Sequence, residues 1–237
     1  MKWEGFLIYV TNSYVLYIVG MGLEYGDMTL KGLKAVSDAS EIFVEDYTSF
    51  PYELDFKLIK LDRKQVESDF LVKKARDAII TLLVPGDPLF ATTHISLVQE
   101  CFKHEVPVEV VHAPSMINAI ARTGLSTYKF GRIVTLSKKF DSDKERIECN
   151  LEAGLHTLCL LDPAIDWLEG LSVLDSMGFS GRVLVCEKLG MNGEKIHYGT
   201  VGELKKLKPG PKPHSIIIPS KLQFFEEEFV QQASTTA

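Results

Sequence analysis

The chain has 237 residues, which is enough for one large domain or two small ones. Its hydrophobic content of 46% and charged content of 24% are those of an ordinary soluble globular protein with a sizeable core. A net charge of −6 leaves no basic excess to neutralise phosphates, which argues against direct binding to nucleic acid.

Cysteine spacing and hydropathy indicate in which cellular compartment we expect the protein. Zinc sites and small disulfide frameworks need close, repeated cysteines, and here the cysteines lie far apart without a C-x-x-C pair, at Cys101, Cys149, Cys159 and Cys186. We therefore expect no metal ion and a reducing, cytoplasmic location. The apolar stretch 6–23 approaches the length of a membrane span. Because Thr11-Asn12-Ser13 interrupts it and no cleavage site follows, we expect no membrane association.

Strands and helices alternate through the first half of the chain. Short apolar runs predict strands at residues 15–19, 42–44, 79–84 and 108–111. Helical spacing and N-cap residues predict helices from Asp27 or Thr29 to Asp38, over 66–78, from Ile95 to before Pro107, and over 116–121 after a Ser115 cap. Residues 50–63 show no clear pattern. This alternation predicts a parallel or mostly parallel sheet with helices on both faces.

The second half continues in the same style without repeating the sequence. Strands are predicted at 133–136, 157–161, 183–186 and 215–218, separated by charged or amphipathic stretches at 141–152 and 164–177. The tail 222–230 is an amphipathic segment, in which we interpret Glu226-Glu227-Glu228 as a solvent-facing surface. We predict an extension at 1–14 and two α/β domains, at 15–111 and 112–237.

Loops that follow predicted strands are the candidate binding segments. They are residues 20–23, 86–90 and 112–116, with a fourth at Asp162-Pro163. Ligands bind at the carboxyl ends of strands in open α/β sheets. Small residues and exposed backbone amides there suit a nucleotide-like ligand. From the residues alone, Gly86-Asp87-Pro88 is either a ligand-binding loop or an ordinary turn.

Motifs of other enzyme classes are mostly missing from the sequence. There is no G-x-x-x-x-G-K-[ST], H-E-x-x-H or G-x-S-x-G string. Gly20, Gly22 and Gly26 do not have the G-x-G-x-x-G spacing, although acidic residues at 41, 45 and 46 keep a nicotinamide-dependent enzyme as an alternative. We interpret four histidines near loops or strand ends as hydrogen-bonded structural residues: His94, His112, His156 and His214.

Taken together, the loops resemble the diphthine synthase family. The resemblance runs in collinear order from about residue 15 to 220. It is carried by Gly86-Asp87-Pro88-Leu89-Phe90-Ala91-Thr92-Thr93-His94, His112-Ala113-Pro114-Ser115-Met116-Ile117-Asn118-Ala119, Tyr128-Lys129-Phe130-Gly131 and Pro213-His214-Ser215-Ile216-Ile217-Ile218. The Ala-Thr-Thr-His and Tyr-Lys-Phe-Gly strings are far more specific than any glycine pattern. Matching strings also occur at 16–23, 27–33, 45–49, 124–125 and 154–162.

This resemblance implies an S-adenosylmethionine-dependent methyltransferase of the tetrapyrrole-methylase fold. Such proteins have two α/β domains with the cofactor in the cleft between them, and usually form homodimers. The family methylates the amino group of a modified histidine of translation elongation factor 2 in diphthamide biosynthesis, and its eukaryotic members also methylate the carboxylate. Methyl transfer from a sulfonium depends on alignment and desolvation and requires no metal.

Cofactor contacts carry over from the family only where its motif matches. They fall on Leu23, Asp87, Phe90, Ser115, Met116, Leu161, Val185 and His214. We expect the acidic Asp87 to bind the ammonium group or the ribose hydroxyls of the cofactor. An amine acceptor must lose a proton before it attacks, whereas a carboxylate needs no base. The sequence identifies no catalytic residue for that proton transfer.

The chain departs from the family pattern in its second half. It is shorter and more charged over 137–151, shorter after Asp162, and has Cys186-Glu187-Lys188 where the family has Leu-Ala-Arg. These changes leave the cofactor loops intact but affect segments that would dock a protein substrate. Two alternatives therefore stay open: a methylase of a tetrapyrrole or other small molecule, and a cofactor-binding protein without catalytic activity.

Overall fold

The structure, a computed structural model, describes residues 13–45, 47–49, 52–137 and 141–233. Its chain divides into two compact units, with the main division between Ala113 and Pro114. We call them the N-terminal unit and the C-terminal unit. The predicted extension at 1–14 lies almost entirely outside the described residues.

A five-stranded parallel sheet forms the N-terminal unit, as the alternating pattern predicts. Its strand order is β3-β2-β4-β1-β5. The strands are β1 (Val15–Gly20), β2 (Glu41–Glu45), β3 (Leu58–Leu61), β4 (Ile79–Val84) and β5 (Val108–Val111). The edge strand β3 lies in the stretch where the sequence shows no clear pattern. The central strands β1 and β4 are the most apolar because both of their faces are covered.

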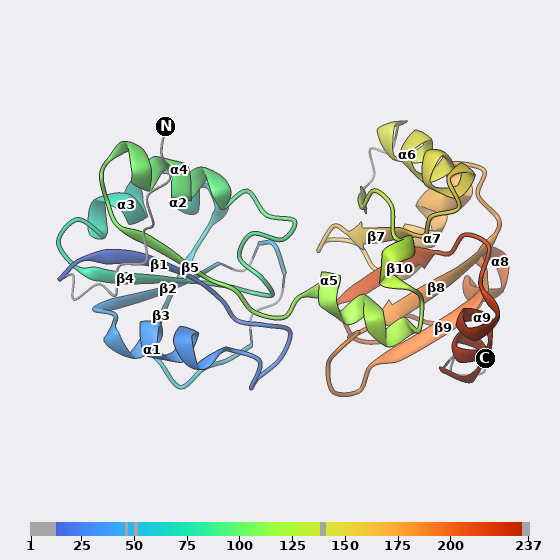
Figure 1. Ribbon diagram of the computed structural model, residues 1–237, viewed down its shortest axis with the longest axis horizontal. Coiled ribbons are helices and arrows are strands. Elements are labelled where there is room, and N and C mark those ends of the chain that lie inside the picture. Colours follow the sequence, from blue (N-terminus) through green and yellow to red (C-terminus); the bar gives the residue numbers. More distant parts are fainter. Residues whose placement is uncertain (1–12, 46, 50–51, 138–140, 234–237) are drawn as a thin grey trace. The chain divides into compact units, whose positions relative to one another are not determined.

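Helices cover both faces of this sheet, with α1 (Leu30–Asp38) on one face and α2 (Arg63–Val66), α3 (Phe70–Lys74) and α4 (Ile95–Lys103) on the other (Figure 1). Helix α1 begins after Thr29, whose hydroxyl accepts the Gly32 N–H at 3.1 Å. The helix predicted over 66–78 is shorter than expected: α3 covers only Phe70–Lys74, and the separate helix α2 ends at Val66. Ser68 separates them, because its hydroxyl donates to the Gln65 carbonyl and accepts the Phe70 N–H.

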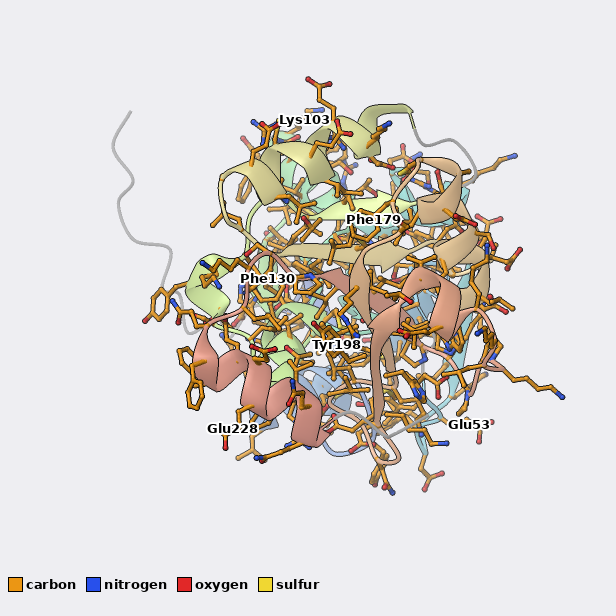
Figure 2. The ribbon with its side chains drawn as sticks, turned by 90° about the vertical axis from the view of Figure 1, so that its right-hand side faces the viewer. Glu53, Lys103, Phe130, Phe179, Tyr198 and Glu228 are labelled. Atoms are coloured by element: carbon orange, nitrogen blue, oxygen red, sulfur yellow. The ribbon has the colours of Figure 1, made fainter. Side chains whose placement is uncertain are left out.

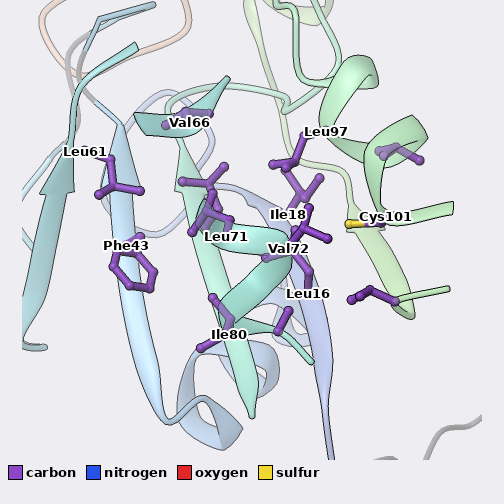
Figure 3. Packing of buried hydrophobic residues seen from close by; sticks show 14 of the residues in the cluster. Leu16, Ile18, Phe43, Leu61, Val66, Leu71, Val72, Ile80, Leu97 and Cys101 are labelled. Carbon is purple, nitrogen blue, oxygen red and sulfur yellow. The ribbon is translucent and has the colours of Figure 1, made fainter. Parts of the chain in front are cut away.

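The main core of the N-terminal unit lies between the sheet and helices α3 and α4. Leu16 and Ile18 of β1 are completely buried, and Ile80 of β4 packs beside them (Figure 3). Leu71 of α3 and Cys101 of α4 close the cluster from the helix side. This packing fixes the carboxyl ends of the central strands, from which the candidate loops leave.

A mixed five-stranded sheet forms the C-terminal unit, in the order β6-β7-β10-β8-β9. Its strands are β6 (Val134–Leu136), β7 (Thr157–Leu161), β8 (Arg182–Glu187), β9 (Lys195–Thr200) and β10 (His214–Ile218). Only β6 and β7 pair in parallel, and the remaining pairings are antiparallel. Strand β9 is not predicted by the sequence. It follows β8 after a short loop, which allows an antiparallel hairpin but no parallel crossover.

Helices of the C-terminal unit are α5 (Met116–Ala119), α6 (Asp141–Glu152), α7 (Trp167–Ser176), α8 (Val201–Leu204) and α9 (Phe224–Ala233). Trp167 of α7 and Leu204 of α8 pack against Val185 and Ile216 of the sheet in one buried cluster. Within the described part of the chain, no helix is both long and apolar enough to cross a membrane, and no group of three or more acidic, cysteine or histidine side chains could hold a metal.

Glu226 of α9 corrects the predicted solvent-facing surface. Its side chain is completely buried and accepts hydrogen bonds from Lys129 Nζ at 2.8 Å and His156 Nε2 at 3.1 Å. The backbone N–H groups of Ser126 and Gln223 also donate to it. The next two glutamates are exposed, and Glu228 points into solvent (Figure 2). The prediction failed for one residue in three because distant partners, not helical periodicity, decide whether a carboxylate is buried.

Candidate functional site

The carboxyl edge of the N-terminal sheet brings two candidate loops together. Gly22 and Gly86 exchange backbone hydrogen bonds of 3.2 and 2.8 Å. A Cβ atom at Gly20 would lie 2.6 Å from the Gly86 carbonyl oxygen and 2.8 Å from Ala113 Cβ. Only glycine at this position lets the loops that follow β4 and β5 close over the end of β1.

Asp87 and His112 meet across the end of β1. Strand β1 lies between β4 and β5 in the sheet, so these two residues come from strands that are not neighbours. One carboxylate oxygen of Asp87 accepts the Leu89 N–H at 3.0 Å, and the other lies 2.7 Å from His112 Nδ1. The Asp87 side chain is 15% exposed and that of His112 is 67% exposed. The loops therefore hold a mostly buried carboxylate behind an exposed imidazole.

Leu23 and Phe90 belong to the same edge of this sheet. Leu23 is half-buried, and its N–H donates to Asp27 Oδ2 at 2.9 Å, which fixes the turn after β1. Phe90 is half-buried, and its N–H donates to the Asp87 carbonyl at 3.3 Å. Two apolar side chains and one carboxylate of the predicted cofactor contacts thus lie on two loops that are hydrogen-bonded to each other.

His94 is a structural residue of the Gly-Asp-Pro loop, as the sequence predicts. It is 1% exposed, with Nδ1 2.9 Å from the Pro88 carbonyl oxygen and Nε2 3.2 Å from the Tyr47 hydroxyl. Burial raises the pKa of Tyr47, so its hydroxyl keeps its proton. With both ring nitrogens engaged, His94 anchors the loop that carries Asp87.

Ser115 and Met116 lie at the start of α5 in the C-terminal unit. The Ser115 N–H donates to Asn118 Oδ1 at 3.1 Å, which supports the start of this helix. The Ser115 hydroxyl is buried and has no hydrogen-bond partner among the described residues. Leaving a buried hydroxyl unpaired costs about 1–3 kcal/mol. Its position next to Met116, which accepts a hydrogen bond from Ser215, makes it a polar atom that a ligand would satisfy.

The remaining three candidate residues belong to the C-terminal sheet. Leu161 is half-buried at the end of β7. Val185 lies inside β8, is fully buried in the core and offers no exposed surface to a ligand. His214 begins β10 and has both ring nitrogens engaged: Nδ1 accepts the Trp167 N–H at 3.3 Å, and Nε2 lies 3.0 Å from the Gly210 carbonyl oxygen. Burial lowers the pKa of His214, which favours the neutral ring.

Comparison with protein families identifies the fold. The profile described as Tetrapyrrole (Corrin/Porphyrin) Methylases matches residues 15–205. The chain belongs to this methylase family. Within the family it is similar to the diphthine synthase of Methanocaldococcus jannaschii, at 36% identity over 90% of this chain and 96% of that protein. The diphthine methyl ester synthase of Dictyostelium discoideum is 30% identical over 92% of this chain and 97% of its own.

A solved structure supports the same placement within the methylase family. The structure described as "Crystal structure of diphthine synthase" superposes with a TM-score of 0.88 and 28% sequence identity, covering 93% of this chain and 96% of that chain. Sequence and fold together place the chain among the diphthine synthases of the tetrapyrrole methylase family.

The sequence did not reveal that His112 pairs with Asp87. His112 directly follows β5, and Asp87 follows β4 after two loop residues, so both are recognisable as residues near strand ends. Their contact depends on β1 lying between those two strands and ending at Gly20. The sequence indicates that both residues lie near strand ends. It does not indicate the order of the strands in the sheet, which brings the two residues together.

Proposed function

We propose that this chain transfers a methyl group from S-adenosylmethionine to the modified histidine of translation elongation factor 2 during diphthamide biosynthesis. The acceptor is the amino group of that side chain, with its carboxylate as a further acceptor. The similarity to the archaeal diphthine synthase carries the proposal, because it extends over 96% of that protein. By the same resemblance we propose that the active form is a homodimer.

The side chains at the candidate positions suit this cofactor. S-adenosylmethionine supplies an electrophilic methyl group on a sulfonium, together with an ammonium group, hydroxyls and an apolar adenine face. Asp87 provides a carboxylate, the half-buried Leu23 and Phe90 provide apolar surface, and Ser115 provides an unpaired hydroxyl. Both Asp87 oxygens already accept one hydrogen bond, and each retains a lone pair for a further donor.

Methyl transfer to the isolated substrate tests this function. Elongation factor 2 that carries the unmethylated intermediate is incubated with the chain and isotope-labelled S-adenosylmethionine, and mass spectrometry counts the methyl groups gained. We expect label on the modified histidine and none on factor that lacks the modification. Cofactor binding by calorimetry without any transfer would instead support a non-catalytic binding protein. Transfer to a tetrapyrrole but not to the factor would support the small-molecule alternative.

A further inference from the structure

The acceptor amine must lose a proton before each methyl transfer, and the pair of Asp87 and His112 is placed to take it. We propose that His112 is the general base of the reaction and that Asp87 is its positioning residue. This inference rests on the proposed function, since it assigns a step of that reaction. It names the residue that the sequence alone left unidentified.

The chemistry of the pair fixes the hydrogen on the ring. An ionised carboxylate only accepts hydrogen bonds, so Nδ1 of His112, which lies 2.7 Å from Asp87 Oδ2, carries the hydrogen. A neutral imidazole has one N–H, and Nε2 therefore presents a free lone pair. The same logic orients the base in serine hydrolases, where a buried aspartate selects the tautomer.

Asp87 and His112 differ in burial, and a general base needs this difference: one side of its ring is held in place and the other is open to the substrate. Asp87 is mostly buried and is held by the Leu89 N–H, so the carboxylate cannot turn away from the ring. His112 is two-thirds exposed, and its Nε2 has no partner among the described residues. A large protein substrate can therefore reach this nitrogen, while the opposite side of the ring stays fixed.

The other histidines lack such a nitrogen. Within the described part of the chain, His94, His156 and His214 use both ring nitrogens in buried or partly buried hydrogen bonds. His104 uses one nitrogen with Glu100 and the other with Arg76. The unpaired nitrogen of His197 is buried. Among the histidines and partners that the structure describes, only His112 combines a fixed tautomer with an exposed, unpaired nitrogen.

The proposed step balances without another reagent. The ammonium form of the acceptor gives one N–H proton to Nε2 of His112, and its electron pair stays on the amine nitrogen. That pair forms the new C–N bond to the methyl carbon. The C–S bond breaks with its electrons going to sulfur, which becomes a neutral thioether. His112 later releases the proton to water, and Asp87 stabilises the transient imidazolium.

The test compares His112→Gln and His112→Ala with a matched control. His104→Gln removes another exposed histidine, whose Nε2 lies 3.0 Å from the Glu100 carboxylate. His104 lies between α4 and β5, before the strand that His112 follows. Single turnovers start from enzyme loaded with S-adenosylmethionine. We expect both His112 variants to slow amine methylation about 10²–10⁴-fold. We expect cofactor binding to change less than twofold, the control to keep its rate, and added imidazole to restore part of the rate of His112→Ala.

A measurement without turnover accompanies the kinetics. Nitrogen-15 NMR of the histidine ring should show His112 protonated at Nδ1 and bare at Nε2 in the intact protein. Asp87→Ala should release this tautomer preference. A ring protonated at Nε2 instead would overturn the inference whatever the rates.

The outcomes separate the inference from the proposed function. If the unaltered chain methylates the factor and His112→Gln is equally fast, the inference falls and the proposed function stands. If slow turnover comes with lost cofactor binding, or if imidazole restores nothing, His112 has a structural role and the inference falls. If the unaltered chain transfers no methyl group to the factor, the proposed function fails and the inference fails with it.

Discussion

His112 with Asp87 and His156 with Glu226 are the same chemical pair in two different surroundings. The first pair lies at 2.7 Å in the N-terminal unit, with the imidazole 67% exposed. The second lies at 3.1 Å in the C-terminal unit, with both side chains completely buried. The difference is in the second ring nitrogen: that of His112 is free, whereas that of His156 accepts the Ser220 N–H at 3.0 Å. A histidine–carboxylate contact therefore has no fixed role.

The buried pair connects segments that are far apart in the sequence. Glu226 accepts hydrogen bonds from the region of Ser126 and Lys129 and from His156, while His156 also binds the backbone of Ser220. The Phe130 ring packs edge-on to His156, with ring centroids 5.3 Å apart. Every polar atom of the two side chains is engaged, so the cluster holds α9 against the rest of its unit.

The largest expected effect in this comparison is on Glu226. Glu226→Ala leaves the Lys129 ammonium and the His156 N–H without their acceptor, and breaking a buried ion pair costs about 3–5 kcal/mol. Urea unfolding should show this loss in the free energy of unfolding. The control is Glu227→Ala on the exposed side of the same helix, which should change stability by less than about 0.5 kcal/mol. Equal effects of the two substitutions would contradict the buried cluster.

Substitutions of the two histidines should differ in their effect on the free energy of unfolding. His156→Ala removes a buried ring and leaves the Ser220 N–H unpaired, so we expect a loss of about 2–3 kcal/mol in the free energy of unfolding. His112→Ala removes an exposed ring and one hydrogen bond to Asp87, so we expect a smaller loss of about 1 kcal/mol. Urea midpoints of the two variants give the comparison. A large loss from His112→Ala would make the exposed pair structural as well.

Asp87 tests whether the exposed pair also touches the cofactor. Asp87→Ala should weaken S-adenosylmethionine binding by about 1–3 kcal/mol if the carboxylate binds the ammonium group or the hydroxyls. Isothermal calorimetry measures this directly, with His112→Gln as the variant that keeps the carboxylate. Unchanged affinity after Asp87→Ala would remove Asp87 from the cofactor site and leave it only its contact with the imidazole.

The smallest expected effect is a dependence of stability on pH that is caused by His156. Burial lowers the pKa of His156, and its hydrogen bond to Glu226 only partly opposes this. The unfolded chain then binds the proton at a higher pH than the folded chain, so stability is full above about pH 6.5 and falls as the pH drops below it. Urea midpoints between pH 7.5 and 5 should decline less in His156→Gln than in the unaltered chain. An equal decline in His156→Gln and in the unaltered chain would contradict the assignment.

Glu226 contributes to stability at lower pH. Burial by itself raises its pKa, but the N–H donors of Gln223, Lys129, Ser126 and His156 outweigh burial and lower the pKa to about 2. Because the folded pKa is below the unfolded value of about 4.3, this stabilisation is full above that value and is lost as the pH falls toward 2. The urea unfolding of His156→Gln therefore stops at pH 5, where the contribution of Glu226 is still complete.

Most strands were predictable because their apolar runs are long and bounded by turn residues. The observed bounds of β4, β5 and β7 are those predicted. Strands β3 and β9 were not predicted, since most of their side chains are only partly buried and neither strand has a continuous apolar run. Position at the edge of a sheet does not by itself remove the signal, because the edge strand β5 was predicted from its valine-rich run.

The candidate loops were predictable for a similar reason, because they follow the most apolar strands. The pairing of Asp87 with His112 was not, since it depends on the order of strands in the sheet. The burial of Glu226 was not predictable from its run of three glutamates, since His156, Lys129 and Ser126 lie 70 to 100 residues earlier in the chain. Contacts between distant residues are set by topology, on which local periodicity carries no information.

The position of Glu226 in the chain also affects the order in which the protein forms during synthesis. All strands of the N-terminal unit precede Ala113, so that unit has its complete sheet early. Ser126 precedes Glu226 by 100 residues. At synthesis rates of about 5–20 residues per second, the ribosome exposes Ser126 several seconds before the carboxylate that accepts its N–H. Until then Lys129 and His156 lack the acceptor that they share, so the C-terminal unit completes this buried cluster only after α9 has emerged.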